Sequence, residues 1–429
     1  MLGGVKYLCP CLSMGIFNMN KFKIIKQSKI SKARIGVVNT EHGKIQTPFF
    51  MPDATRAAVK SLNNIDLEQL GLQSMVCNTY HLYLQPEISV IKKAKGIHSF
   101  MNWDKPLLSD SGGFQVYSLV HKHRSMARLR SNCVETTARQ GKITDKEVIF
   151  KSPLNGALHK LTPEKSIQIQ FTLGTDMIVC LDDCPPHNID NIQMEKSVER
   201  TIAWAKRCKQ EYNKQCQKNN RQPLLFGVIQ GGTDLAMRKK CAEGLLEIGF
   251  HGYGFGARPI DTDGRFLDKV LDYTADLIPK KNLRFGLGIG LPEDIVRCAQ
   301  MGWDMFDCVI PTREGRHGRL FCWKRNNKKQ ITKNKDLPAC KAGILNLKSQ
   351  NSKKFYKTLN INNAKFKKDL SPINKDSKLP ELREYSKAYL HHLLKTNESL
   401  GYRLASLNNL EFYLNLMRKI REEIKAGRL

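Results

Sequence analysis

The stretch Asp304-Met-Phe-Asp-Cys-Val-Ile-Pro-Thr-Arg-Glu-Gly-Arg-His-Gly-Arg319 passes from an apolar segment through a proline into a run of cations. A strand over Met305–Ile310 would bury its apolar side chains and leave the carboxylate of Asp307 inside, or at the mouth of, a barrel or sheet. A buried carboxylate is costly unless it is paired or used chemically. Three arginines follow it, which is enough positive charge to bind a phosphate backbone. The pattern indicates chemistry on a nucleic acid. The alternative is that Asp307 caps a loop and the arginines are solvated.

The totals of the chain favour a polyanionic partner. Its 429 residues include 70 Lys and Arg against 40 Asp and Glu, a formal net charge of +30. A Lys- and Asn-rich composition can also follow from genome base bias. The 13 cysteines are scattered, which indicates reduced thiols and a cytoplasmic protein. No apolar run reaches about 18 residues, so we expect no membrane span.

Short apolar runs alternate with helical patterns from about residue 21 onward, which predicts parallel βα units. Roughly eight such units in about 300 residues favour a (β/α)8 barrel over an open sheet. No GxGxxG motif opens a first unit, which disfavours a dinucleotide-binding fold. The expected strands are Ser74–Asn78, Leu107–Asp110, Met177–Asp182, Leu225–Gln230, Gly252–Gly256, Leu283–Gly288 and Met305–Ile310. The expected helices are Asn64–Leu70, Pro163–Leu173, Glu195–Gln215, Leu235–Ile248 and Asp263–Ile278.

Four polar residues fall at the C-terminal ends of expected strands: Asp110, Asp182, Gln230 and Asp307. Barrels of this kind carry their active sites on the face formed by those ends. We therefore expect these four side chains to lie together.

The expected organisation has four parts. Residues 1–18 form an N-terminal extension, in which Cys9 and Cys11 lack the second pair that a metal site needs, and Met19 is a candidate start. Residues 19–331 form the barrel, interrupted by a basic insertion at 120–141. A Lys- and Asn-rich stretch at 332–361 follows, and residues 362–429 form a C-terminal helical subdomain with helices over 386–396 and 412–425. The two inserted stretches are expected to be loops, either solvated or in contact with phosphates.

Six stretches carry a family resemblance. They are LLSDSGGFQVYSL (107–119), PFFMPDATRAAVKSL (48–62), NTYHLYLQP (78–86), LFGVIQGG (225–232), DMFDCVIPTR (304–313) and YSKAYLHHL (385–393). In sequence and order they resemble the bacterial tRNA-guanine transglycosylases, also called queuine tRNA-ribosyltransferases. The matches run from about residue 33 to 427.

The resemblance implies exchange of guanine at the wobble position of tRNAs with a G-U-N anticodon for a 7-deazaguanine base, as in queuosine biosynthesis. Asp307 resembles the nucleophile, which attacks the ribose C1′ and forms a covalent ribosyl-enzyme ester. Asp110 resembles the proton acceptor that activates the incoming base. The logic is that of a retaining glycosidase, in which one carboxylate bonds covalently and another moves protons.

The resemblance also assigns the binding residues. Asp182 would accept hydrogen bonds from the purine N1–H and amino group, and Gln230 would bond the ring carbonyl. The expected base-binding set is Ser111, Gly112, Gly113, Phe114, Asp182, Gln230, Gly256 and Ala257. The expected RNA-binding set is Gly288, Ile289, Gly290, Leu291, Pro292, Glu293, Asp294, Thr312, Arg313, Glu314, Gly315 and Arg316.

Two departures from the family affect the base pocket. Gly256-Ala257-Arg258 stands where the family has Gly-Gly-Leu, so Arg258 is expected to disturb the shape of the pocket. Ile260 stands where queuine-using members tend to have glycine. A branched side chain there favours 7-aminomethyl-7-deazaguanine over the bulkier queuine.

A third departure concerns zinc. Ser377, Leu379, Leu382 and Asn408 stand at the positions of the family's three cysteine ligands and one histidine ligand. Leucine cannot bind zinc, so we expect no zinc and no other cofactor. The expected partners are tRNA and the deazaguanine base, and homodimerisation is left open. Two rival interpretations remain: a non-catalytic or decayed tRNA-binding relative, and a plain basic RNA-binding protein. The four retained polar residues at strand ends favour the enzyme.

Overall fold

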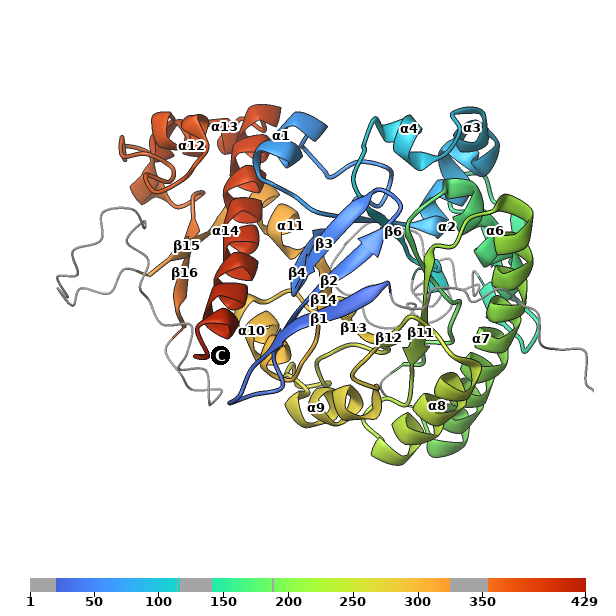
Figure 1. Ribbon diagram of the computed structural model, residues 1–429. Helices are drawn as coiled ribbons and strands as arrows, with labels where there is room; N and C mark the ends of the chain where they lie inside the picture. The colour runs from blue at the N-terminus through green and yellow to red at the C-terminus, as the bar shows by residue number, and fades with distance from the viewer. Residues whose placement is uncertain (1–20, 114, 116–140, 187–188, 325–353) are drawn as a thin grey trace, which may run out of the picture.

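The computed structural model describes residues 21–113, 115, 141–186, 189–324 and 354–429, and its centre is a barrel (Figure 1). Eight parallel strands are hydrogen-bonded in the order β4–β14–β13–β12–β11–β10–β6–β5. A bridge between Asp53 and Val76 joins the two end strands and closes the ring. The predicted (β/α)8 barrel is confirmed. The strands are β4 (Phe49–Pro52), β5 (Met75–Cys77), β6 (Leu107–Ser109), β10 (Met177–Val179), β11 (Leu224–Ile229), β12 (Gly252–Phe255), β13 (Leu283–Gly286) and β14 (Met305–Cys308).

Helices connect the strands and begin and end where local sequence requires. In α6, the Thr162 side chain accepts a hydrogen bond from the Lys165 N–H, Pro163 occupies the first turn, and Gly174 ends the helix in a left-handed conformation. The expected bounds of α6 and α8 are confirmed, whereas α7 is longer than expected and α9 starts later. The helices are α1 (Asn64–Gln69), α2 (Thr79–Leu82), the π-helix η1 (Tyr83–Glu87), α3 (Ile88–Lys93), α4 (Ile97–Met101), α6 (Pro163–Leu173), α7 (Asn191–Asn219), α8 (Leu235–Ile248), α9 (Asp268–Leu277), α10 (Pro292–Gln300) and α11 (Ile310–Arg316).

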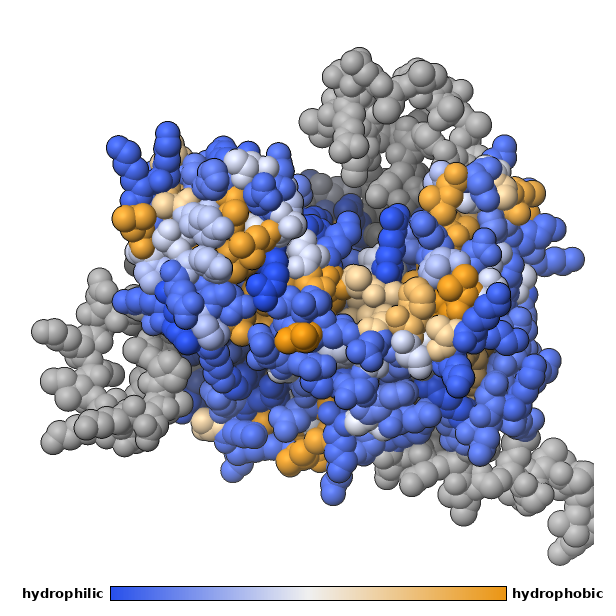
Figure 2. Space-filling view, turned by 90° about the horizontal axis from the view of Figure 1, so that it is seen from above, coloured by the Kyte–Doolittle hydropathy of each residue, from blue (hydrophilic) through white to orange (hydrophobic). Residues whose placement is uncertain are grey.

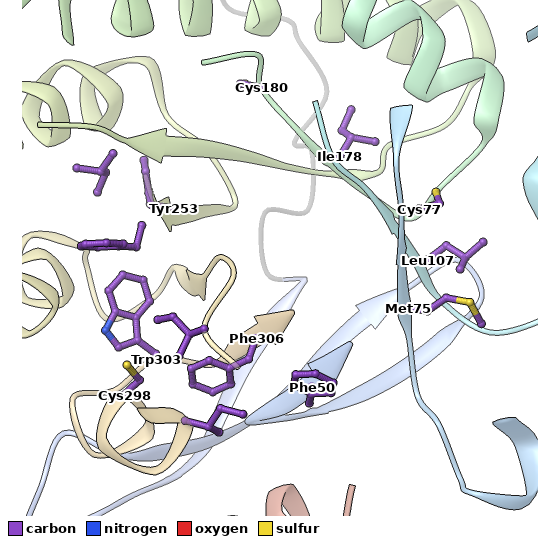
Figure 3. Close-up of a cluster of buried hydrophobic side chains, with 14 of the residues drawn as sticks. Phe50, Met75, Cys77, Leu107, Ile178, Cys180, Tyr253, Cys298, Trp303 and Phe306 are labelled. Carbon is purple, nitrogen blue, oxygen red and sulfur yellow. The ribbon is translucent and has the colours of Figure 1, made fainter. Parts of the chain in front are cut away.

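Successive side chains of each strand point to opposite faces of the barrel wall, and this alternation produces two hydrophobic cores. Side chains such as Met51, Val228 and Met305 point into the barrel and form the inner core. Their sequence neighbours, such as Phe50 and Phe306, point outward and pack under the helices, as Figure 3 shows. The barrel is therefore filled by side chains, and any ligand must bind at one of its ends.

An antiparallel sheet that sequence analysis missed covers the N-terminal end of the barrel. It contains β1 (Phe22–Gln27), β2 (Arg34–Thr40) and β3 (Gly43–Thr47). Phe22, Val38 and Ile45 belong to the inner core of the barrel. Arg34 makes a buried bidentate ion pair with Asp304, with Nε–Oδ1 at 2.9 Å, which fixes this sheet to the start of β14. The N-terminal end is closed, which leaves the C-terminal end for a substrate.

Two parts of the expected organisation need correction. The strand expected over Met305–Ile310 ends at Cys308, because Ile310 already begins α11 with Pro311 in its first turn. The stretch 332–361 is not only loop: β16 (Tyr356–Asn360) pairs antiparallel with β15 (Arg319–Trp323). A second small sheet, β7 (Gly141–Ile143), β8 (Val148–Lys151) and β9 (Leu158–Leu161), begins at the last residue of the other inserted stretch.

The C-terminal subdomain is helical, as expected, but its last helix is much longer than predicted. It contains the 3-10 helix η4 (Ala364–Phe366), α12 (Pro380–Glu384), α13 (Lys387–Lys395) and α14 (Ser399–Lys425). Figure 1 shows α14 running beside β15 and β16 and over α11. No helix among the described residues is long and apolar enough to cross a membrane, and hydrophilic side chains cover most of the face in Figure 2.

Candidate active site

A layer of polar side chains closes the inner core at the C-terminal end of the barrel. The inward-facing positions of several strands are apolar along their length and become polar at the next inward position. Val228 is followed by Gln230, and Met305 is followed by Asp307. The inward-facing polar residues reached in this way are Asp53, Asn78, Asp110, Gln230 and Asp307.

Asp110 follows β6 and is held by three hydrogen bonds. Its carboxylate accepts from Asn78 Nδ2 at 2.5 Å, from the Thr79 N–H at 3.0 Å and from the Gly112 N–H at 3.2 Å. Burial raises the pKa of Asp110 to about 7, and the charges of Asp53 and Asp307 add to the rise. A carboxyl group that titrates near neutral pH is suited to both giving and taking a proton.

Asp307 lies on β14 and accepts a hydrogen bond from the Gly288 N–H at 3.0 Å. Burial raises the pKa of Asp307 to about 6, and the charge of Asp53 adds to the rise, although the side chain remains partly open to the barrel mouth. The Gly288 N–H opposes this rise. At neutral pH Asp307 is therefore mostly ionised, which is the state that a nucleophile needs.

A second group of polar residues lies across the mouth, after β10 and β11. Gln230 Nε2 donates to Asp182 Oδ2 at 2.6 Å, while Gln230 Oε1 is buried and has no hydrogen-bond partner among the described residues. Burial raises the pKa of Asp182 to about 6. A Cβ on Gly256 would lie 2.5 Å from the Gln230 amide carbon, and one on Gly113 would lie 3.1 Å from Asp182 Oδ1. Gly256 is required for this close packing, and Gly113 leaves only a tight space beside Asp182.

In the segment Gly256–Arg258, an alanine occupies a backbone conformation that usually requires glycine. Ala257 has a φ of 79°, a left-handed conformation that costs an alanine roughly 1–2 kcal/mol. The Arg258 side chain is exposed, and its expected effect on the shape of the pocket stays a prediction. Ser111 Oγ accepts from the Gly113 N–H at 3.2 Å and so shapes the turn behind Asp110. Phe114 lies outside the described residues, as do residues 1–18, Met19 and most of the two inserted stretches.

The expected RNA-binding residues divide into two groups by exposure. Gly288, Leu291 and Arg313 are exposed, and Glu293, Glu314 and Arg316 are partly exposed. The rest are buried. The buried members are Ile289, Gly290, Pro292, Asp294, Thr312 and Gly315.

Helix α14 fixes both of the stretches that contain these residues. The Tyr413 hydroxyl donates to the Gly290 carbonyl at 2.6 Å. A Cβ on Gly315 would lie 3.0 Å from the backbone of Ala405, so α11 and α14 are in close contact there. Arg316 Nη1 is buried and has no hydrogen-bond partner among the described residues, which leaves a donor for a ligand.

The positions at which the resemblance places zinc ligands are occupied by a different kind of core. Leu379 and Leu382 are buried among apolar side chains of the subdomain. The Ser377 hydroxyl donates to Glu411 Oε2 at 2.6 Å, and the Lys378 N–H donates to Glu411 Oε1 at 2.7 Å. Asn408 Nδ2 donates to the Phe321 carbonyl at 3.1 Å. These residues do not fit a zinc ion, because two cannot bind it and the polar groups are already paired.

One other group among the described residues could in principle hold a metal ion: His42, His98 and Asp176, at the N-terminal end of the barrel. The two rings stack with centroids 3.6 Å apart. His42 Nδ1 lies 2.9 Å from Asp176 Oδ1, and His98 Nε2 lies 3.3 Å from Asp176 Oδ2. Parallel rings do not direct their lone pairs at one point, so we interpret the group as a clamp that holds the β2–β3 turn on the barrel.

Sequence analysis missed two residues of the polar layer, Asn78 and Asp53, and the neighbouring Thr79. Asn78 and Thr79 hold Asp110, and Asp53 follows β4. The signal for Asp53 was weak, because the apolar run before it, Phe49–Pro52, has only four residues. We did not identify that run as a strand.

Comparison with known proteins agrees with this geometry. The family model for queuine tRNA-ribosyltransferase matches residues 28–429. The queuine tRNA-ribosyltransferase of Halothermothrix orenii is 39% identical over 408 residues, which covers 95% of this chain and 94% of that protein. The enzyme of Shouchella clausii is 39% identical over 403 residues, which covers 94% of this chain and 92% of that protein. The enzyme of Staphylococcus aureus (strain bovine RF122 / ET3-1) is 38% identical over 408 residues, which covers 95% of this chain and 93% of that protein. A match over nearly the whole chain, with Asp110, Asp182, Gln230 and Asp307 at the same end of the barrel, shows that the chain belongs to the queuine tRNA-ribosyltransferase family.

Proposed function

We propose that this pentosyltransferase exchanges guanine at the wobble position of tRNAs with a G-U-N anticodon for a 7-deazaguanine base, through a covalent ribosyl-aspartate. The observation that supports the proposal is the pair Asp110 and Asp307. They lie in one polar layer, but their pKa values are about 7 and about 6, so one can remain protonated while the other is ionised.

The reaction is a double displacement. Asp307 attacks C1′ of the ribose, the C1′–N9 bond breaks, and Asp110 gives its proton to the leaving guanine. The incoming base then returns a proton from its N9 to Asp110 and attacks C1′, which breaks the ester and frees Asp307. Each carboxyl group ends in the state in which it began, so the cycle needs no further reagent.

Base recognition uses the other side of the mouth. An ionised Asp182 accepts from the N1–H and the 2-amino group of a guanine-like base, a donor pair that adenine lacks. Gln230 Nε2 has a second N–H that can donate to the ring carbonyl, and its Oε1 remains free to accept from a donor on a ligand. Ile260 is partly buried on the loop after β12, where it supports a preference for 7-aminomethyl-7-deazaguanine over queuine.

The proposal includes no zinc. The hydrogen bonds of Ser377 and Asn408, and the packing of Leu379 and Leu382, support a C-terminal subdomain that folds without a metal ion. Metal analysis of the purified protein tests this, and stoichiometric zinc that cannot be dialysed away would contradict it.

The first test is incorporation of radiolabelled guanine into a tRNA with a G-U-N anticodon. We expect incorporation by the native chain and by Asp104→Asn, an exposed control, and none by Asp307→Asn. A band of labelled RNA attached to protein on a denaturing gel, absent with Asp307→Asn, would support the covalent ester. Binding of the tRNA without any exchange would instead favour a non-catalytic relative.

A further inference from the structure

Asp53 occupies a place in the polar layer between the two catalytic candidates. It follows β4, which pairs with β14 on one side and is bridged to β5 through Val76 on the other. Asp307 lies on β14, and Asp110 follows β6, the next strand after β5. The inward-facing row Phe49, Met51 and Asp53 carries its carboxylate to the barrel mouth. Its charge acts on both acids, since it contributes to the raised pKa of each.

Asp53 is a partly buried carboxylate that is hydrogen-bonded by the backbone and the side chain of one neighbouring residue, Thr55. The Thr55 hydroxyl donates to Asp53 Oδ2 at 2.5 Å. Lys60 and Arg316 are near enough for their charges to act on it, yet no cation of the described chain lies within ion-pair distance. Burial raises the pKa of Asp53 above its ordinary value. A partly buried acid with spare acceptor capacity, facing an active-site opening, is suited to a hydroxyl donor on a ligand.

The order of the strands shows which part of a nucleotide Asp53 would meet. The base-recognition residues lie after β10, β11 and β12, and Asp307 lies on β14. A nucleotide with its base on the first side and its C1′ at Asp307 can place its sugar toward β4, the strand that pairs with β14. The hydroxyl next to C1′ in RNA is the 2′-OH. The charge of Arg316 also acts on Asp53, and its Nη1 has no hydrogen-bond partner among the described residues. This Nη1 can donate a hydrogen bond to a phosphate next to the sugar.

We propose that Asp53 accepts a hydrogen bond from the 2′-hydroxyl of the nucleotide undergoing exchange, and so makes the chain select ribose over deoxyribose at that position. This inference rests on the proposed function. The 2′-OH is the group by which a protein distinguishes RNA from DNA at a given site. A carboxylate acceptor makes the contact charge-assisted, which is stronger than a contact between neutral groups.

The test compares two substrates in two proteins. The substrates are RNA hairpins with a G-U-N loop that differ only in carrying guanosine or 2′-deoxyguanosine at the exchanged position. For the native chain we expect kcat/KM for guanine exchange to fall about 10- to 100-fold without the 2′-OH, the size of one charge-assisted hydrogen bond. For Asp53→Ala we expect the two substrates to differ by less than about threefold, because the acceptor is gone.

The ratio of the two substrates, rather than the absolute rate, is the decisive readout. Removing the charge of Asp53 also lowers the pKa of Asp110 and Asp307, but that change affects both substrates alike. Asp53→Asn, which keeps an acceptor oxygen, should retain part of the discrimination and serves if the alanine variant does not fold. Asp104→Asn should discriminate as the native chain does.

Two results would overturn the inference and leave the proposed function standing: no penalty for the deoxy substrate in the native chain, or the same penalty in Asp53→Ala. If the native chain exchanges no guanine even into the ribose hairpin, the proposed function fails. In that case competition binding of the two hairpins decides the role of Asp53. Equal affinities for the native chain would refute it, and a preference for ribose that is lost in Asp53→Ala would support it.

Discussion

The hydrogen bonds of Glu411 give a prediction that can be worked from the structure. The side chain is 5% exposed and accepts from the Ser377 hydroxyl at 2.6 Å and from the Lys378 N–H at 2.7 Å. Replacing Glu411 by alanine leaves both donors without a partner in a mostly buried place, at about 1–3 kcal/mol each. Because the serine hydroxyl can rotate toward another acceptor, we expect a total loss of about 2–4 kcal/mol. Glu411→Gln keeps one acceptor oxygen and should lose roughly half as much.

The loss should be local, because Glu411 joins α14 to the segment before α12. Hydrogen exchange of the backbone amides in α12 and α13 reports opening of this part separately from the barrel. A loss of 2–4 kcal/mol corresponds to exchange roughly 30- to 1,000-fold faster in the alanine variant. Glu398→Ala, an exposed glutamate of the same subdomain, should exchange as the native chain does.

Hydrogen exchange in the presence of a chelator tests whether the C-terminal subdomain is stable without a metal ion. We expect EDTA and added zinc to change neither the exchange rates nor the melting temperature of the native chain. The reasoning would be refuted by unchanged exchange in Glu411→Ala, or by slower exchange of α12 and α13 on addition of zinc.

Three further predictions concern the barrel. The kcat/KM for tRNA should fall below pH about 6, because Asp307 becomes protonated, and above pH about 7, because Asp110 loses its proton. A pH–rate profile measures both changes, and a flat profile would contradict the assigned roles. Ala257→Gly should stabilise the chain by up to about 1 kcal/mol in urea unfolding, because relief of the left-handed strain exceeds the greater chain entropy of glycine; a loss of stability would show that the strain is absent. Asp304→Asn should cost about 3–5 kcal/mol in the same assay by leaving Arg34 charged and unpaired, and a change below about 1 kcal/mol would contradict the buried ion pair.

Much of the barrel could be predicted because its strands are buried on both faces. Such strands appear as continuous apolar runs with a polar residue at the end, as at Leu225–Gln230, and the expected and observed bounds differ by one or two residues at most ends. Asp182 is the exception among the site residues. Its strand ends at Val179, and the side chain is brought to the pocket by the loop.

What the sequence did not reveal depends on long-range contacts. The run Phe49–Pro52 is too short to identify as a strand by itself, and it is stabilised by pairing with β14, so Asp53 was missed. Strands β1 to β3 contain both polar and apolar residues. Their apolar side chains pack against the N-terminal end of the barrel, a contact that local sequence does not indicate. In α14, the polar residues Asn408 and Asn409 interrupt the apolar pattern. Both are buried and bonded to backbone groups, which no local pattern can indicate.

The dependence of the barrel mouth on α14 has a consequence for the order in which the chain is made. All eight barrel strands and both catalytic candidates leave the ribosome before Tyr413, whose hydroxyl donates to the Gly290 carbonyl in the loop that also carries Gly288, the hydrogen-bond donor to Asp307. A nascent chain can therefore form its barrel early but lacks the contact that fixes this loop until the last helix is complete. A chain cut short within α14 would therefore contain both catalytic candidates but lack the contact that fixes the loop at the barrel mouth.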